Sequence, residues 1–174
     1  IIDINVVGGF NETSLIIAAK KGLVKIVDWI LETFGEDVNY NYKDINEDTA
    51  FSKALENEKF EVCEKIINKY KDVLIFYPKK NGMEIFETLI TKSLYDSLKY
   101  FIDFLRKSPI YREKIKPGGL ERALGLAILK ENFDVVKEIV SKFNDLINLE
   151  YVAEDGKGFL SMACENSTNE NLIF

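Results

Sequence analysis

Apolar residues recur along the sequence with the spacing of amphipathic helices. Four segments repeat a pattern with apolar residues at positions i, i+1, i+4 and i+5, which gathers them on one helical face. These segments are residues 25–31, 61–67, 96–102 and 134–140. Each one predicts a short helix with one apolar stripe and one solvated face.

A second helical pattern comes before each of these segments at a fixed distance. Its copies start at residues 13, 49, 84, 122 and 158, so successive starts are 36, 35, 38 and 36 residues apart. Each unit is two short helices plus a connection, and such a unit buries its apolar stripe only by stacking on its neighbours. A small residue recurs at one place in the first helix, where we expect equivalent buried positions: Ala18, Ala54, Ala127 and Ala163.

The first unit resembles the ankyrin repeat. The family motif runs Asp-x-x-Gly-x-Thr-Pro-Leu-His-x-Ala-Ala, then x-x-Gly-His, then Val-Val with Leu-Leu, and it closes with Gly-Ala-Asp-Val-Asn. The residues in register with it are Thr13, Leu15, Ala18, Ala19, Gly22, Ile26, Val27, Ile30 and Leu31. Gly82 and Gly156 each stand two residues before a start, as the family glycine does. Gly22 falls in the turn between the first two helices, where a left-handed residue is useful.

The resemblance implies an all-α fold, an ankyrin-type helix-pair solenoid with finger loops, as a single domain over residues 1–174. Residues 3–5 precede Thr13 by the family spacing and residues 172–174 are apolar, so we expect a fragment with an incomplete repeat at each end. No repeat keeps the proline or the histidine of the Thr-Pro-Leu-His turn. In the family this histidine ties neighbouring turns together, so its loss puts the regularity of the stack in doubt; Ser52 is one of its replacements.

Other helical repeats are the alternative to the ankyrin interpretation. Tetratricopeptide units also span about 34 residues, but their aromatic and proline signature is absent from this sequence. Armadillo-like units are longer than the observed spacing. The ankyrin-type repeat therefore fits the pattern best.

Composition narrows the function classes. The net charge is −6 and the sequence pI is about 4.9, which does not support nucleic-acid binding. Histidine is absent, which removes the usual nucleophile chemistry and the common zinc sites. The acidic residues alternate with lysines, as on solvated helix faces. We therefore expect no catalytic residues, no metal and no cofactor, and we expect the chain not to be an enzyme.

The two cysteines and the hydropathy indicate the cellular compartment of the protein. Cys63 and Cys164 lie within apolar helical patterns, as buried free thiols do, and two cysteines do not make a disulfide framework. No apolar run approaches the roughly 18 residues that span a bilayer, so we expect no membrane insertion in this fragment. We expect a cytoplasmic or nucleocytoplasmic protein.

The connecting segments, or fingers, are unusually aromatic. Aromatic residues at exposed loop tips mark interfaces because they bury a large area at small entropic cost. The alternative is that these rings pack between fingers or onto the helices. The residues are Tyr40, Tyr42, Ile75, Phe76, Tyr77, Tyr111, Tyr151 and Val152. Trp29, in the second helix, is open to the same two interpretations.

Ankyrin-type proteins usually contact their ligands through a concave strip, formed by the residues before the threonine and those that close the first helix. The resemblance places on it Phe10, Glu12, Ile45, Asp48, Lys80 and Met83, and at the helix ends Lys20, Lys21, Glu56, Asn57, Lys92 and Lys130. Phe76 and Tyr77 join them as finger residues. Lysines outnumber acidic residues at the helix ends, which favours a partner segment carrying carboxylates, unless these are ordinary solvated lysines.

The sequence thus predicts a protein–protein interaction module, a scaffold or adaptor whose partner is another protein. One alternative is a structural segment of a longer ankyrin array in a membrane-tethered or cytoskeletal protein. Another is the recognition domain of an enzyme whose catalytic part lies outside this fragment.

Overall fold

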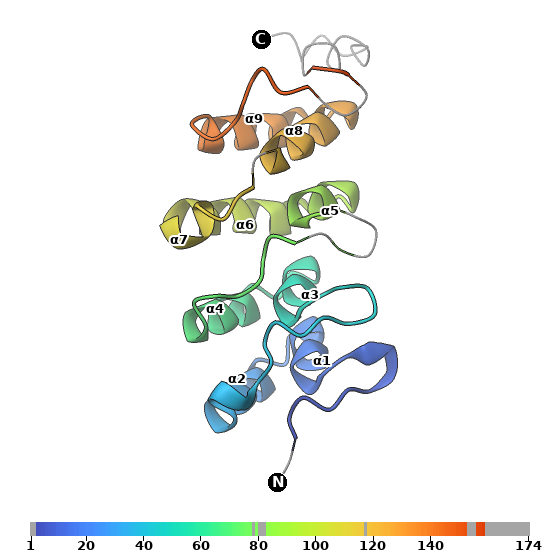
Figure 1. Ribbon diagram of the computed structural model, residues 1–174, viewed down its shortest axis with the longest axis vertical. Helices are drawn as coiled ribbons and strands as arrows, with labels where there is room; N and C mark the ends of the chain where they lie inside the picture. The colour runs from blue at the N-terminus through green and yellow to red at the C-terminus, as the bar shows by residue number, and fades with distance from the viewer. Residues whose placement is uncertain (1–2, 78, 80–82, 117, 153–155, 159–174) are drawn as a thin grey trace. The chain divides into compact units, whose positions relative to one another are not determined.

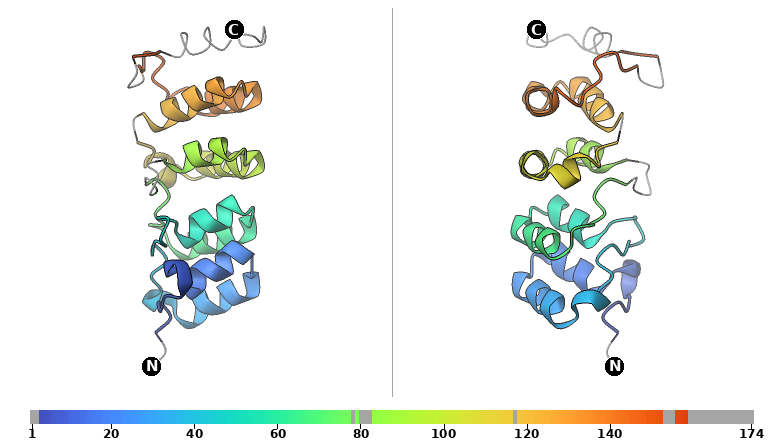
Figure 2. Two further views of the ribbon diagram at one scale, coloured as in Figure 1. Left: turned by 90° about the vertical axis from the view of Figure 1, so that its right-hand side faces the viewer. Right: turned by 60° about the vertical axis from the view of Figure 1, so that its left-hand side comes forward.

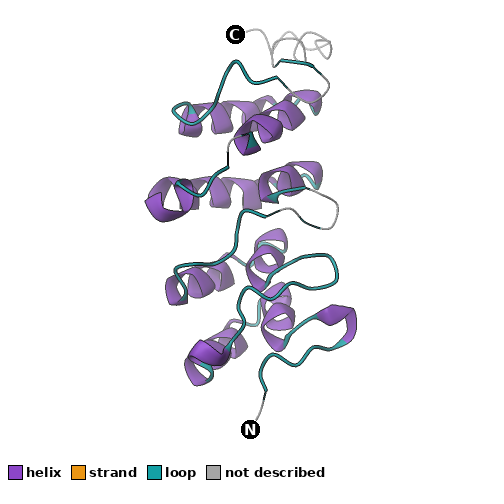
Figure 3. Cartoon of the chain, in the orientation of Figure 1, coloured by secondary structure: helices purple, strands orange, loops and turns teal. Residues whose placement is uncertain are grey.

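The computed structural model describes residues 3–77, 79, 83–116, 118–152 and 156–158. They belong to two compact units, residues 1–85 and 86–174. Within the described residues the secondary structure consists of helices, two isolated β-bridges and loops, with no strand (Figure 3). Within each unit the helices come in pairs joined by a tight turn (Figure 1).

The first unit contains the helix pairs α1–α2 and α3–α4, which are stacked one on the other (Figures 1 and 2). Its elements are η1 (Gly9–Asn11), α1 (Ser14–Lys21), α2 (Val24–Thr33), η2 (Gly35–Asp37), α3 (Ala50–Glu56) and α4 (Phe60–Lys69). The first helices of the two pairs, α1 and α3, pack on each other, and the second helices, α2 and α4, do the same. This is the stacking that the apolar stripes require.

The second unit is built in the same way. Its elements are α5 (Ile85–Thr91), which begins at the boundary, α6 (Tyr95–Lys107), the short α7 (Pro109–Arg112), α8 (Gly119–Leu129) and α9 (Phe133–Phe143). Helix α9 packs on both α8 and α6. Helix α8 starts before the expected repeat start at Arg122, which therefore lies inside the helix.

Threonines begin the first helices of the first unit. The Thr13 hydroxyl accepts the Ile16 N–H at 3.3 Å, and the Thr49 hydroxyl accepts the Ser52 N–H at 3.3 Å. Ser52 completes a capping box, because its Oγ accepts the Thr49 N–H at 2.9 Å. These caps satisfy N–H groups that have no partner within the helix.

The described repeated alanines occupy equivalent positions. Ala18, Ala54 and Ala127 are all buried; Ala163 lies outside the described residues. Each of the three carbonyls also accepts the same turn hydrogen bond: Ala18 from Leu23 N–H at 2.9 Å, Ala54 from Lys59 N–H at 2.8 Å and Ala127 from Asn132 N–H at 2.9 Å. The three helix ends therefore match in hydrogen bonding as well as in burial.

The turns between paired helices share one left-handed residue. Gly22 has φ 69°, as the sequence predicts, and the corresponding residues in later turns also have positive φ: Glu58 (58°), Ser93 (57°) and Glu131 (54°). These four positions repeat the spacing of the starts. The hairpin turn is thus kept even where glycine is not.

Candidate interaction surface

The first two fingers have equivalent backbones, fixed by two asparagines. The Asn5 side chain donates to the Asp37 carbonyl at 2.7 Å and accepts the Asn39 N–H at 2.7 Å. The Asn41 side chain makes the same pair of bonds one repeat later, to the Asp72 carbonyl at 3.2 Å and from the Leu74 N–H at 2.7 Å. We call residues 3–13 the first finger and residues 39–49 the second finger.

Hydrogen bonds also hold the two fingers together at their tips. The Ile45 N–H donates to the Phe10 carbonyl at 3.1 Å. The Tyr42 hydroxyl donates to Asn11 Oδ1 at 2.9 Å, and Asn11 Nδ2 donates to the Lys43 carbonyl at 3.4 Å. The tips are therefore fixed relative to each other before any partner arrives.

Two of the expected contact residues stand at these tips with apolar side chains in solvent. Phe10 is 75% exposed and Ile45 is 51% exposed. Phe10 also has a left-handed backbone, with φ 62°, which is strained for a bulky residue. Phe10 is thus an exposed aromatic residue whose backbone has a conformation that glycine would adopt more easily.

The helix ends beside the fingers supply cations. Lys20 and Lys21, at the end of α1, are both exposed. Lys20 Nζ forms an ion pair with Glu12 at 3.1 Å, and Glu12 itself is largely buried. Asn57, at the end of α3, is exposed and donates to the Lys53 carbonyl at 2.8 Å. Of these residues, Lys20, Lys21 and Asn57 are accessible to a partner, and Glu12 is not.

Asp48 and Glu56 belong to an interior charge cluster, contrary to the expectation that they line the strip. Lys53 Nζ lies 2.6 Å from Asp48 Oδ2 and 3.0 Å from Asp44 Oδ2. Lys79 Nζ lies 2.5 Å from Asp48 Oδ1 and also pairs with Glu56. We call these five residues the charge cluster. The cluster links α3 to the second finger and, through Lys79, to the third finger, of which the structure describes residues 74–77, 79 and 83–84. Its carboxylates are shielded from water.

Burial and pairing compete in setting the charges of this cluster. Burial alone would raise the pKa of the Asp48 carboxyl, but hydrogen bonds from Lys53 and Lys79 outweigh it and hold that pKa below 3.8. Burial likewise would lower the pKa of Lys53, but the bonds to Asp48 and Asp44 raise it above 10.5. Both groups are therefore ionised at neutral pH, as a structural ion pair requires.

The aromatic residues of the third finger pack inside, so the exposed-tip interpretation is wrong for Phe76 and Tyr77. Both side chains are buried, as is Ile75. The Tyr77 hydroxyl donates to Ser52 Oγ at 3.0 Å and accepts the Thr49 N–H at 3.1 Å. Ser52 stands where the family has its histidine, so this bond restores a tie between neighbouring turns.

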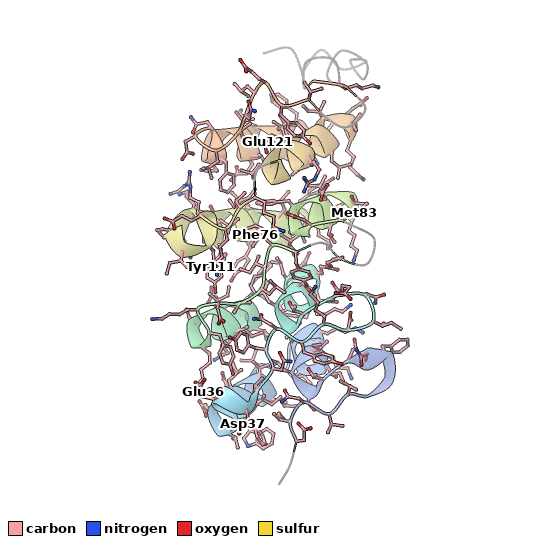
Figure 4. The ribbon with its side chains drawn as sticks, viewed as in Figure 1. Glu36, Asp37, Phe76, Met83, Tyr111 and Glu121 are labelled. Atoms are coloured by element: carbon pink, nitrogen blue, oxygen red, sulfur yellow. The ribbon has the colours of Figure 1, made fainter. Side chains whose placement is uncertain are left out.

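Other finger aromatics pack as well. The Tyr40 ring stacks on Tyr70 with 3.7 Å between centroids, and Tyr40 donates a hydrogen bond to Asp72, which raises the pKa of Tyr40 to about 12. Tyr111, which Figure 4 labels in α7, is buried 5.3 Å from the Phe104 ring. Val152, in contrast, is exposed. Most of these rings therefore pack between fingers or onto the helices and are not exposed at the loop tips.

The remaining strip residues lie on or near α5 and α8. Lys92 and Lys130 are exposed at the ends of these helices, and Lys130 Nζ donates to the Thr91 carbonyl at 3.3 Å. Met83 is half-buried on the finger side of its unit (Figure 4), and its carbonyl accepts the Lys79 N–H at 2.9 Å. Lys80 lies outside the described residues.

Two features were missed from the sequence. Lys79 gave no signal, because a lysine beside Lys80 in a loop resembles a solvated charge. The burial of the charge cluster likewise depends on how the third finger folds back onto α3.

Within the described part of the chain, no group of three His, Cys, Asp or Glu side chains could hold a metal ion. Each described helix is too short or too polar to cross a membrane.

Comparisons with known proteins agree with this architecture. No protein-family model matches the sequence, and no curated protein does. One similar solved chain comes from the structure of the Bd0816 predatory endopeptidase of Bdellovibrio bacteriovorus in complex with immunity protein Bd3460, with TM-score 0.67 and 18% identity. That match covers 98% of this chain and 83% of the other.

A second similar structure is an ankyrin repeat domain from Acinetobacter baumannii AYE, with TM-score 0.65 and 13% identity. It covers 91% of this chain and 74% of that one. The fold therefore defines an all-α helix-pair solenoid. This fold resembles that of an ankyrin repeat domain, as the sequence predicts.

Proposed function

We propose that this chain is a protein–protein interaction module, a scaffold or adaptor without catalytic activity. It binds its partner through the tips of the first two fingers and the adjoining ends of the first helices. A buried thiol at Cys63, whose pKa is raised by burial, suits the reducing cytoplasm. The similarity to a chain in a complex of two proteins supports a protein as the partner.

The observation that carries the proposal is Phe10. Its ring is exposed, its backbone is strained, and a hydrogen bond from the Ile45 N–H of the second finger holds its carbonyl. Strained residues cluster at binding sites, where the surrounding structure holds them. A backbone that is held in advance reduces the entropy lost on binding, and aromatic side chains are common anchors of an interface. With Ile45 beside it, Phe10 forms an apolar anchor point.

The charges around this anchor define the partner further. Lys20 and Lys21 are exposed at the end of α1, and Asp48 is inside the charge cluster rather than on the surface. The strip is therefore more cationic than the sequence suggests. Exposed lysines attract a partner that carries carboxylates and speed its approach at low salt. The partner segment is expected to pair an apolar side chain with flanking acidic residues.

Photo-cross-linking tests this proposal. A photoreactive phenylalanine analogue is placed at position 10 or 45, with position 25 on the exposed face of α2 as the matched control. Irradiation in cells of the source organism is expected to give one discrete protein adduct from positions 10 and 45, and none from position 25. An adduct formed only from position 25 would move the interface to the second helices.

The purified partner then tests the charges. The variant Lys20→Glu, at the end of α1, is expected to slow association at low salt and to change it little at high salt. Lys21→Glu is the companion variant, because Lys20 is already paired with Glu12. An unchanged association rate at low salt would contradict a role for these lysines and would restrict the interface to the apolar finger tips.

A further inference from the structure

A groove of about 460 Å³ lies between α6 and α9 in the second unit. These two helices pack directly on each other, so the groove is formed within one unit (Figure 1). Its volume is within the range of about 300–1,000 Å³ that is usual for ligand sites. The floor is apolar, because Leu98 is 2% exposed and Val135 is 7% exposed. The groove therefore offers an apolar surface to a group larger than water.

Charged side chains from both helices line the rim of this groove. Helix α6 contributes Asp96 and Lys99, and helix α9 contributes Asp134 and Glu138. Asp96, Lys99 and Asp134 are exposed, and Glu138 is half-buried. The rim thus carries three carboxylates and one ammonium, so Lys99 can neutralise only one of the carboxylates. This balance favours a cation over an anion as the occupant.

The first unit shows a cation at the corresponding place. Lys65 of α4 reaches across to α2, where its Nζ lies 2.8 Å from Asp28 Oδ1. By the repeat spacing, Glu138 stands in α9 where Lys65 stands in α4. A cationic side chain can therefore lie between two stacked second helices of this protein, but in the second unit α9 does not supply it.

The two aspartates of the rim differ from their counterparts in the first unit. Asp96 corresponds to Lys25 and Asp134 corresponds to Glu61, so a pair of opposite charges has become a pair of like charges. Two carboxylates on the same groove repel each other, and a cation between them converts this repulsion into two attractions. This pair is therefore the part of the rim that is most favourable for a cation.

An exposed aromatic ring completes the groove. Tyr95 is the first residue of α6, lines the groove and is 39% exposed. Its hydroxyl donates to Ser93 Oγ at 3.4 Å, which holds the ring at the start of the helix. A guanidinium stacks on aromatic faces, and its planar fork of donors can bond two carboxylates at once, whereas an ammonium is a compact and strongly hydrated charge. Arginine therefore fits this groove better than lysine.

We infer that the groove between α6 and α9 binds an arginine side chain of a protein partner, at a site separate from the finger tips. The guanidinium lies between Asp96 and Asp134 and stacks on the Tyr95 ring. The methylene stem lies on Leu98 and Val135, as the stems of long cationic side chains do on apolar surfaces. Because both aspartates are exposed, the groove is open to a side chain that projects from another protein.

Peptide titration followed by NMR tests this inference on the whole chain. The probe is a short capped peptide with one arginine between glycines, and the comparison peptides carry lysine, norleucine or glutamate in its place. The readout is the methyl signals of Leu98, Ile102 and Val135 at physiological ionic strength. The arginine peptide is expected to shift these signals saturably and to bind more tightly than the other three. Asp96→Asn with Asp134→Asn is expected to weaken its binding about tenfold or more.

A matched control variant separates this site from general charge attraction. Glu113→Gln with Glu150→Gln removes the same charge from exposed positions that do not line the groove, and it is expected to leave binding unchanged. An equal loss in this control would overturn the inference, because net charge alone would then attract the peptide. Norleucine or lysine peptides that bind as tightly as the arginine peptide, or methyl signals that do not move, would overturn it as well.

Discussion

Glu58 adopts the same left-handed backbone as Gly22, one repeat later in the chain. Its φ is 58° where that of Gly22 is 69°. The Gly22 N–H donates to Ala19 and the Glu58 N–H donates to Leu55, each at 3.1 Å. The turn is thus imposed by the two helices that it joins, because a glutamate accepts a conformation that disfavours side chains.

Glu58→Gly is therefore expected to stabilise the protein. The left-handed conformation costs a residue with a Cβ about 1–2 kcal/mol, and glycine returns about 0.5–1 kcal/mol of this as lost backbone entropy. The expected gain in the free energy of unfolding is about 0.5–1 kcal/mol, measured by urea denaturation. The reverse change, Gly22→Ala, serves as the control and is expected to destabilise, because its Cβ would also meet Lys59. A loss of stability in Glu58→Gly would show that its side chain has an unrecognised role.

Ala54→Leu is expected to overpack the stack. Ala54 is buried on α3, where α1 packs, so added methylenes have no free space. The expected loss is roughly 1–3 kcal/mol in the free energy of unfolding. Lys25→Leu, at an exposed position of α2, is the control and should change stability little. Equal effects of the two variants would argue against close packing at the alanine position.

Lys79→Met tests the charge cluster. The change leaves Asp48 and Glu56 buried without one of their cations, and such a loss costs about 3–5 kcal/mol. Lys65→Met removes a more exposed ion pair with Asp28 and should cost only about 0–1 kcal/mol. Chemical denaturation of both variants gives the comparison. Similar small losses would mean that water reaches the cluster.

The charge cluster is expected to lose part of its contribution to the free energy of unfolding in acid. The pKa of Asp48 is lower in the folded chain than its ordinary value of 3.8. Its contribution is therefore complete above about pH 4 and is lost as the pH falls through the folded value. Urea midpoints measured from about pH 5 down to pH 2 should fall more steeply for the native chain than for Asp48→Asn. Parallel curves would assign the acid sensitivity to other carboxylates.

The fold could be predicted from the sequence because its signal is periodic. The spacing of the alanines, of the apolar stripes and of Gly22 reports the same repeat, so each copy supports the others. The start at Arg122 falls inside α8 because the connection before it folds as extra helix, beginning at Gly119. Local turns such as this carry no periodic signal.

The candidate surface was only partly predictable. Phe10 and Ile45 are exposed because finger tips project from the helices, which the resemblance implies. Asp48 and Tyr77 are buried because the third finger folds over α3 and brings Lys79 with it. That long-range contact replaces the family histidine, and nothing in the local sequence indicates it.

The measurement that tests the protein-binding proposal most directly is Phe10→Gly, examined for both stability and binding. Glycine relieves the strained backbone, so the free energy of unfolding is expected to rise by up to about 1 kcal/mol. It also removes the anchor, so dissociation of the cross-linked and purified partner is expected to accelerate roughly thirtyfold or more, as for a hot-spot residue worth about 2 kcal/mol. Greater stability together with weaker binding is the predicted result. Greater stability with an unchanged dissociation rate would contradict the proposal that the finger tips bind the partner.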